Sequence, residues 1–90
     1  MAYWRGIIAG INQRVNAERT PNFKAWRIGL THDVSKRCEE CGKPENFVYW
    51  EADSLADAQA IEAHFINQEG MKGGTHGDFD DRKKIYVYIF

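Results

Sequence analysis

The chain has 90 residues and a formal net charge of -1, with 43% hydrophobic and 13% aromatic residues. This length suits one domain, 1–90, and the apolar content argues against a disordered chain. The broad basic composition of many nucleic-acid-binding domains is absent. No stretch approaches the roughly 20 apolar residues of a membrane span, and no signal-peptide pattern opens the sequence. We therefore expect a cytoplasmic protein with reduced cysteines and no membrane partner.

The first half of the sequence predicts a helix, a strand and a second helix. Residues 3–19 place apolar side chains at three- and four-residue steps, which is typical of an amphipathic helix. Gly6 and Gly10 each cost about 1 kcal/mol there relative to alanine, so a strand in the first part of this segment is the alternative. Residues 24–31 begin as an apolar–polar alternation and predict a strand. Residues 34–40 follow an aspartate suited to a helix N-cap and predict a short helix.

The second half predicts a strand, a long helix, a loop and a final strand. Residues 46–52 are rich in aromatic and β-branched types, which favour a strand. Ser54 is a suitable cap for a helix that Gly70 would end. Residues 71–81 form a glycine-rich acidic loop, and 83–90 predict the last strand. Its side chains should alternate between two faces, with Ile85, Val87 and Ile89 on one and Tyr86, Tyr88 and Phe90 on the other.

These elements predict a small α/β (α+β) domain with the order α-β-α-β-α-β. Three helices should pack on a three-stranded sheet. Each connection between strands passes through a helix, so parallel pairing is compatible with the sequence, which does not determine the strand order. The residues expected to contribute most to the core are Trp4, Trp26, Tyr49, Trp50, Phe65 and the run 86–90.

One segment resembles a known signature. Residues 27–37 read Arg-Ile-Gly-Leu-Thr-His-Asp-Val-Ser-Lys-Arg, and Arg37 lies eight residues after Gly29. This arrangement resembles the second half of the GIY-YIG nuclease signature, in which Tyr-Ile-Gly ends a strand and an arginine follows on a helix. Residues 57–62, Asp-Ala-Gln-Ala-Ile-Glu, resemble the helix that carries the family's glutamate. The resemblance covers residues 26–70, about half the chain.

The resemblance implies metal-dependent hydrolysis of phosphodiester bonds. Glu62 would hold Mg²⁺ or Mn²⁺, Arg37 would steady the charge of the phosphate, and a tyrosine would help to activate water. The residue types suit these roles, because hard cations prefer carboxylate oxygens and arginine makes planar contacts that lysine cannot. A metal and a guanidinium beside a reacting phosphate would both stabilise its charge.

The sequence departs from the family pattern in two places. Arg27 stands where the family has the first tyrosine of Tyr-Ile-Gly, and no Gly-Ile-Tyr strand precedes it. In a rearranged topology the C-terminal strand would fill that place and supply Tyr86 or Tyr88. This hypothesis requires the strand to lie close to Arg37. As ordinary alternatives, Arg37 and Glu62 would be solvated and both tyrosines would only pack the sheet.

The glycine-rich loop adds further candidates. Backbone N–H groups of Gly73 and Gly74 could cradle an anion, since glycine allows close approach of the backbone. His76 could transfer a proton near neutral pH. The alternative is a flexible connector to the last strand.

Cys38 and Cys41 form a Cys-x-x-Cys pair at the end of a predicted helix. Zinc needs four ligands, and only histidines (His32, His64 and His76) could complete a site, so we do not expect zinc there. Redox pairs usually open a helix, where the thiol pKa is lowered, so two reduced structural cysteines are the favoured interpretation.

Two functional hypotheses follow. The first is a metal-dependent endonuclease that uses Arg37, Glu62, His76 and either Tyr86 or Tyr88. The second is a non-catalytic module on the same scaffold, which binds nucleic acid or a partner protein through Arg27, Arg37 and the glycine-rich loop.

Overall fold

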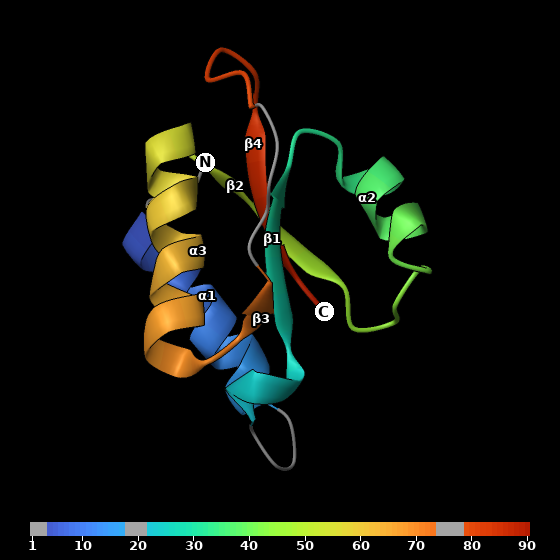
Figure 1. The fold of residues 1–90 in the computed structure, drawn as a ribbon, viewed down its shortest axis with the longest axis vertical. Helices are drawn as coiled ribbons and strands as arrows, with labels where there is room; N and C mark the ends of the chain where they lie inside the picture. The colour runs from blue at the N-terminus through green and yellow to red at the C-terminus, as the bar shows by residue number, and fades with distance from the viewer. Residues whose placement is uncertain (1–3, 18–21, 74–78) are drawn as a thin grey trace.

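The computed structural model describes residues 4–17, 22–73 and 79–90. Within these ranges three α-helices and a four-stranded sheet form a mixed α/β domain, which confirms the predicted class. In Figure 1, α1 and α3 lie together on one face of the sheet and α2 stands on the other. The helices are α1 (Trp4–Asn16), α2 (Val34–Glu40) and α3 (Leu55–Glu69), and the strands are β1 (Arg27–Thr31), β2 (Val48–Ala52), β3 (Lys72–Gly73) and β4 (Ile85–Ile89).

The sheet has the order β2-β4-β1-β3, so the last strand of the chain lies in its interior. β4 is antiparallel to both β1 and β2, while β3 pairs parallel to β1. The three-strand prediction was wrong by one strand, because Lys72 and Gly73 of the expected loop pair with the start of β1. The apolar and aromatic composition of β4 suits a position where neighbours cover both of its edges.

Several predicted boundaries differ from the structure. The segment before β1 forms a short 3₁₀ helix, η1 (Phe23–Ala25), because the Asn22 side chain accepts a hydrogen bond from the Lys24 N–H. β2 begins two residues later than expected, at Val48. α1 is a helix and not the alternative strand, and it ends at Asn16. α3 has the predicted ends, since Ser54 caps it and Gly70 closes it in the left-handed conformation.

The core lies between the sheet and the pair α1/α3. The apolar faces of both helices are fully buried there, as are alternate residues of β4. The prediction for Trp26 is confirmed, and Trp50 is partly buried against the core. The prediction for Tyr49 was wrong, because its side chain projects from the opposite face of β2 and is 50% exposed. The fully buried large side chains are Ile7, Ile11, Val15, Ile61, Phe65, Val87 and Ile89.

The two glycines of α1 have different surroundings. An added Cβ at Gly10 would lie 2.8 Å from Nε1 of Trp50, whereas nothing lies within 4 Å of one at Gly6. We expect Gly6→Ala to raise the free energy of unfolding by about 0.5–1 kcal/mol, because alanine is the better helix former. Gly10→Ala should lower it, since the indole must move. Urea unfolding measures both changes, and equal signs for the two variants would contradict this packing.

Candidate functional site

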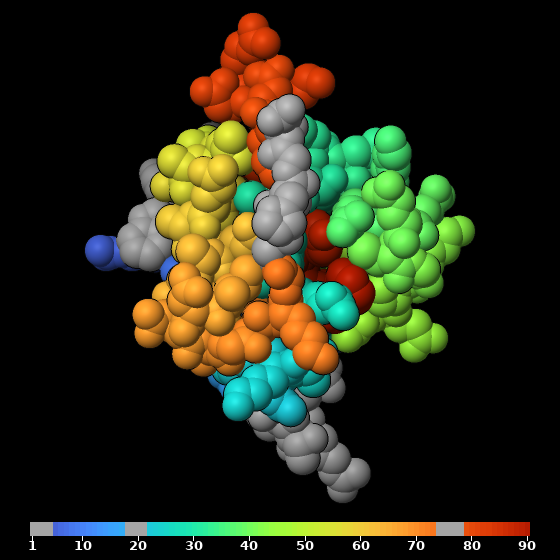
Figure 2. All heavy atoms as spheres, viewed as in Figure 1, coloured from blue at the N-terminus to red at the C-terminus, as the bar shows by residue number. Residues whose placement is uncertain are grey.

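The face of the sheet towards α2 carries aromatic and polar side chains. Tyr86 and Tyr88 of β4, and Phe90 just after it, alternate with the core residues, as predicted. Gly29 lies opposite Tyr88 on β1, and Tyr49 lies opposite it on β2. Figure 2 shows the α2 segment in green beside the dark-red end of β4. This face is therefore the place where α2 can meet the tyrosines of the last strand.

Arg37 and Tyr88 are in direct contact at this place. The Arg37 Nε–H donates a hydrogen bond to the Tyr88 hydroxyl over 2.7 Å, and the guanidinium carbon lies 5.6 Å from the centre of the phenol ring. The two residues come from α2 and β4, 51 positions apart in the sequence. The structure thus meets the condition that the rearranged topology required, namely the last strand close to Arg37.

Gly29 makes this contact sterically possible. A side chain on Gly29 would overlap the hydroxyl and the adjacent ring atoms of Tyr88. The ring therefore lies directly over the backbone of β1, where only a glycine leaves room. The glycine of the Ile-Gly sequence has a packing role that the sequence pattern alone did not indicate.

Two further rings hold Tyr88 in place. Phe47 stacks on Tyr88 with ring centres 5.3 Å apart, and Phe90 stacks on it at 6.1 Å. Tyr88 is only 3% exposed, whereas the side chain of Arg37 remains 41% exposed. Glu40 lies 3.7 Å from an Nη atom of Arg37, a partly exposed pairing expected to add little stability. The result is a guanidinium held at Nε by a buried group, with its outer edge open to solvent.

The electrostatics keep both groups in their protonated forms. The hydrogen bond to Tyr88 raises the pKa of Arg37 further above its ordinary high value, so its charge is permanent. Burial raises the pKa of the Tyr88 phenol, and this effect exceeds the lowering caused by the hydrogen bond from Arg37. The negative charge of Glu62 also contributes to the rise. At neutral pH Tyr88 is therefore a phenol that can donate a hydrogen bond while it accepts one from Arg37.

Glu62 lies on α3 and is partly exposed. Its helix lies on the face of the sheet opposite α2, and its negative charge contributes to the raised pKa of Tyr88. In the described parts of the chain no three His, Cys, Asp or Glu side chains gather as a metal site. One carboxylate still suits Mg²⁺, which keeps several waters and often completes its shell with substrate phosphate oxygens. Glu62 would be the protein ligand of such an ion.

The other predicted site residues have separate positions. Arg27 is exposed at the start of β1, in register with exposed Lys72 of β3 on the same side of the parallel pair. Gly73 lies against the backbone of Ile28, which a side chain would strike. Tyr86 does not accept the Arg37 hydrogen bond but packs edge-on against Tyr49 at 5.8 Å. Gly74 and His76 lie outside the described residues.

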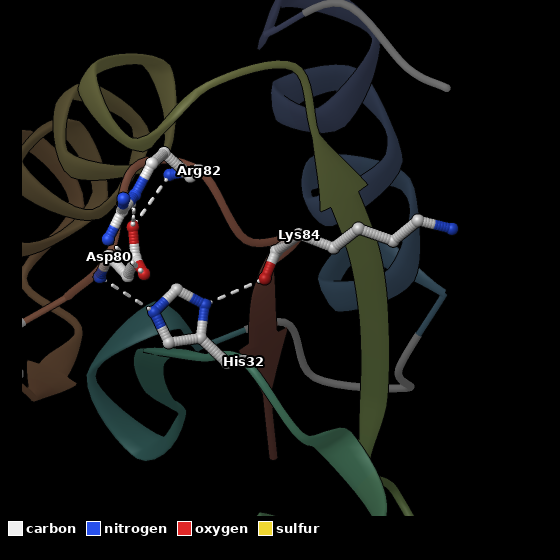
Figure 3. Close-up of polar contacts among 4 residues, drawn as sticks. All are labelled: His32, Asp80, Arg82 and Lys84. Carbon is white, nitrogen blue, oxygen red and sulfur yellow. Dashed lines mark hydrogen bonds and ion pairs between the residues drawn. The ribbon is translucent and has the colours of Figure 1, made fainter.

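His32 connects the end of β1 to the turn before β4 (Figure 3). The backbone N–H of Asp80 donates to its Nε2 over 3.1 Å, and its Nδ1 lies 2.7 Å from the carbonyl oxygen of Lys84. Because Nε2 accepts, Nδ1 carries the proton and donates it. Hydrogen bonds from Arg82 to the carboxylate hold the pKa of Asp80 below its ordinary value. In this structure both ring nitrogens of His32 are used in fixing the turn that leads into the Tyr88 strand.

The two cysteines are free and partly exposed at the end of α2. Cys41 is the C-cap residue of the helix, as the sequence position suggested. The backbone N–H of Cys41 donates to the carbonyl oxygen of Arg37 over 3.0 Å, one helical turn before it. His64, a second candidate zinc partner, packs edge-on against the ring of Phe65.

Comparisons with known proteins give no family for this chain, so its function is inferred from the site alone. No protein-family model, curated protein or solved structure matches the chain. No helix within residues 4–17, 22–73 and 79–90 is long and apolar enough to cross a membrane.

Proposed function

We propose that this chain is a GIY-YIG-like domain that acts on nucleic acid by metal-dependent phosphodiester hydrolysis. The observation that supports the proposal best is the hydrogen bond between Arg37 and Tyr88. The resemblance implies an arginine on the helix after Ile28-Gly29 and a tyrosine from a strand beside it. On this proposal β4 would supply that tyrosine from the C-terminal side, with the order of the elements rearranged relative to the family.

The chemistry of the pair suits a phosphate. The outer edge of Arg37 can donate two parallel hydrogen bonds to phosphate oxygens when it leaves its weak, partly exposed pairing with Glu40, and Tyr88 already fixes Nε and hence the plane of the guanidinium. The protonated hydroxyl of Tyr88 can donate a third to an oxygen of the same group. A Mg²⁺ or Mn²⁺ ion on Glu62 would supply Lewis acidity and a water of lowered pKa. Arg27 on β1 and Lys72 on β3 add positive charge that could contact the nucleic-acid backbone on either side of the bound phosphate.

A non-catalytic binding module is the second candidate. The observation in its favour is the raised pKa of Tyr88, because a phenol that stays protonated is a poor base for activating water. The same arginine and hydroxyl would then bind a phosphate without cutting the strand.

Cleavage assays separate the two candidates. Plasmid and branched DNA would be incubated with the protein in Mg²⁺ or Mn²⁺, and in EDTA. We expect cutting in metal only, with Arg37→Ala and Glu62→Gln each lowering the rate by at least roughly 100-fold, the size seen for loss of one transition-state contact. Tyr88→Phe keeps the ring but removes the hydroxyl, and should also lower the rate.

Matched controls test whether the effects belong to the site. Arg82→Ala removes an arginine that pairs with Asp80 in the turn before β4, and Tyr86→Phe removes a hydroxyl from the same strand as Tyr88. Both should cut at the native rate. Metal-dependent binding or cutting that ignores Arg37→Ala would overturn the proposal, whereas Arg37-dependent binding without cutting would establish the second candidate.

A further inference from the structure

A groove runs beside α2 on the same face of the sheet. It has a volume of about 450 Å³, within the range of ligand-binding clefts. We call it the Tyr49 groove. Its lining comes from α2, from the turn that follows it and from the approach to β2, and includes Val34, Cys38, Lys43, Pro44, Phe47 and Tyr49.

Tyr49 provides an exposed aromatic surface in this groove. Among the described residues it is the large hydrophobic side chain that stands open to solvent, at 50% exposure. Tyr86 packs against it at 82° and 5.8 Å, which limits the freedom of the ring. A held aromatic ring beside an apolar hollow is a suitable surface for stacking a planar group.

Lys43 brings a positive charge to the groove. The end of α2 is a Schellman motif, in which the N–H of Lys43 bonds to the carbonyl of Cys38 and the N–H of Gly42 to that of Glu39. Gly42 takes the left-handed conformation of this motif, and Lys43 follows it at φ 52°, a conformation that is unfavourable for residues other than glycine. Backbone hydrogen bonds thus fix the backbone of Lys43 beside the groove.

The remaining polar groups suit the edge of a nucleobase. Ser35 and Glu39 also line the groove. A carboxylate accepts hydrogen bonds from exocyclic amino groups, and a serine hydroxyl pairs with either kind of base edge. An aromatic ring, a cation and a carboxylate together match the base and the phosphate of one nucleotide better than they match an apolar peptide side chain.

The groove also borders the Arg37 site. Phe47 lines the groove and stacks on Tyr88 with ring centres 5.3 Å apart, while the hydroxyl of Tyr88 holds Arg37. The rings of Phe47 and Tyr88 therefore lie between the groove and Arg37. A strand with a phosphate at Arg37 would bring a neighbouring nucleotide to the groove.

We propose that the Tyr49 groove holds an unpaired base next to the phosphate that Arg37 binds. This inference rests on the proposed function and specifies its substrate, namely nucleic acid with a single-stranded arm or junction. A paired base is stacked within its duplex and could enter the groove only after it had left the stack.

The test measures binding without cleavage. Fluorescence anisotropy in EDTA would compare a duplex that carries a single-stranded arm with the same duplex whose arm has abasic nucleotides. We expect the native chain to prefer the arm with bases by roughly 5- to 150-fold, the range for stacking one base. Tyr49→Ala should abolish this preference and Tyr49→Phe should keep it. Lys43→Ala should weaken binding to both arms alike and reduce its salt dependence.

Arg37→Ala, with Arg82→Ala as its control, distinguishes the groove proposal from the proposed function on which it rests. The groove proposal would be overturned if the native chain bound both arms equally, or if Tyr49→Ala bound them as the native chain does. If that binding still depended on Arg37, the proposed function would remain intact. A protein segment would then be the remaining occupant of the groove. Binding that ignores Arg37→Ala would overturn the proposed function, whereas no binding to either arm would overturn the groove proposal. Thermal unfolding should give Tyr49→Ala a native-like midpoint, since the side chain is exposed.

Discussion

Replacing Phe65 by alanine is expected to lower the free energy of unfolding by about 3–5 kcal/mol. The ring is fully buried on α3, where Phe23 stacks on it at 6.1 Å and His64 contacts it edge-on at 5.0 Å. A domain of this size has a total stability of about 0.05–0.15 kcal/mol per residue, so the loss would be a large part of the whole. The midpoint of thermal unfolding should fall by more than about 12 °C.

Urea unfolding followed by tryptophan fluorescence would measure this loss. The slope of the free energy of unfolding against urea concentration should stay unchanged, because the cavity does not alter the surface that unfolding exposes. The urea midpoint should fall, because the cavity destabilises the native state. Phe65→Leu is the matched control and should lose less than half as much, since leucine refills most of the space. A loss below about 1 kcal/mol for Phe65→Ala would contradict the placement of this ring at the centre of the core.

Local patterns predicted the helices because the forces that set them act over a few residues. The three- and four-residue steps of α1 and α3 correspond to the buried stripes, and Asp33 and Ser54 cap their helices through the expected side-chain hydrogen bonds. Gly70 ends α3 for an equally local reason. Each of these signals links residues that are only a few positions apart in the sequence.

The sheet depended on contacts that no local pattern contains. Lys72 and Gly73 carry no strand signal, and they pair with β1 because α3 ends beside it. The place of β4 between β1 and β2 follows from pairing over long sequence distances. Tyr49 was assigned to the core from its residue type, although its position in β2 directs it to the other face of the sheet.

The candidate site shows the same division. The spacing from Gly29 to Arg37 could be seen in the sequence, but the choice between Tyr86 and Tyr88 could not. Both tyrosines share one face of β4, so only the register decides between them. Tyr88 lies opposite Gly29 and accepts the hydrogen bond from Arg37. Tyr86 lies opposite Thr31, two residues earlier on the strand. The stacking of Phe47 on Tyr88 depends on the same register and had no sequence signal.

Gly29→Ala is expected to destabilise the domain by about 1–3 kcal/mol and to separate Arg37 from Tyr88. The backbone of Gly29 is part of strand β1, so alanine should fit it without backbone strain. The cost arises because the new methyl group would overlap the hydroxyl end of the Tyr88 ring. Stacking against Phe47 and Phe90 restricts the directions in which that ring can move.

Two measurements would test this result. Urea unfolding gives the change in stability, and the NMR signal of the Arg37 Nε–H reports the hydrogen bond, because the bonded proton exchanges slowly with water. The signal should be protected in the native chain and lose protection in Gly29→Ala and in Tyr88→Phe. Gly6→Ala adds the same methyl group at an open position and should leave the signal unchanged.

A double-mutant cycle would separate steric overlap from any other effect of the substitution. In a Tyr88→Val background the ring is gone, so Gly29→Ala should cost much less than in the native chain. An equal cost in both backgrounds would mean that the ring is not what the methyl group meets. A reduced cost, together with loss of Arg37-dependent nucleic-acid binding in Gly29→Ala alone, would show that Gly29 contributes to the site through the position of Tyr88. The glycine would then be needed for phosphate binding although it has no side chain to touch the phosphate.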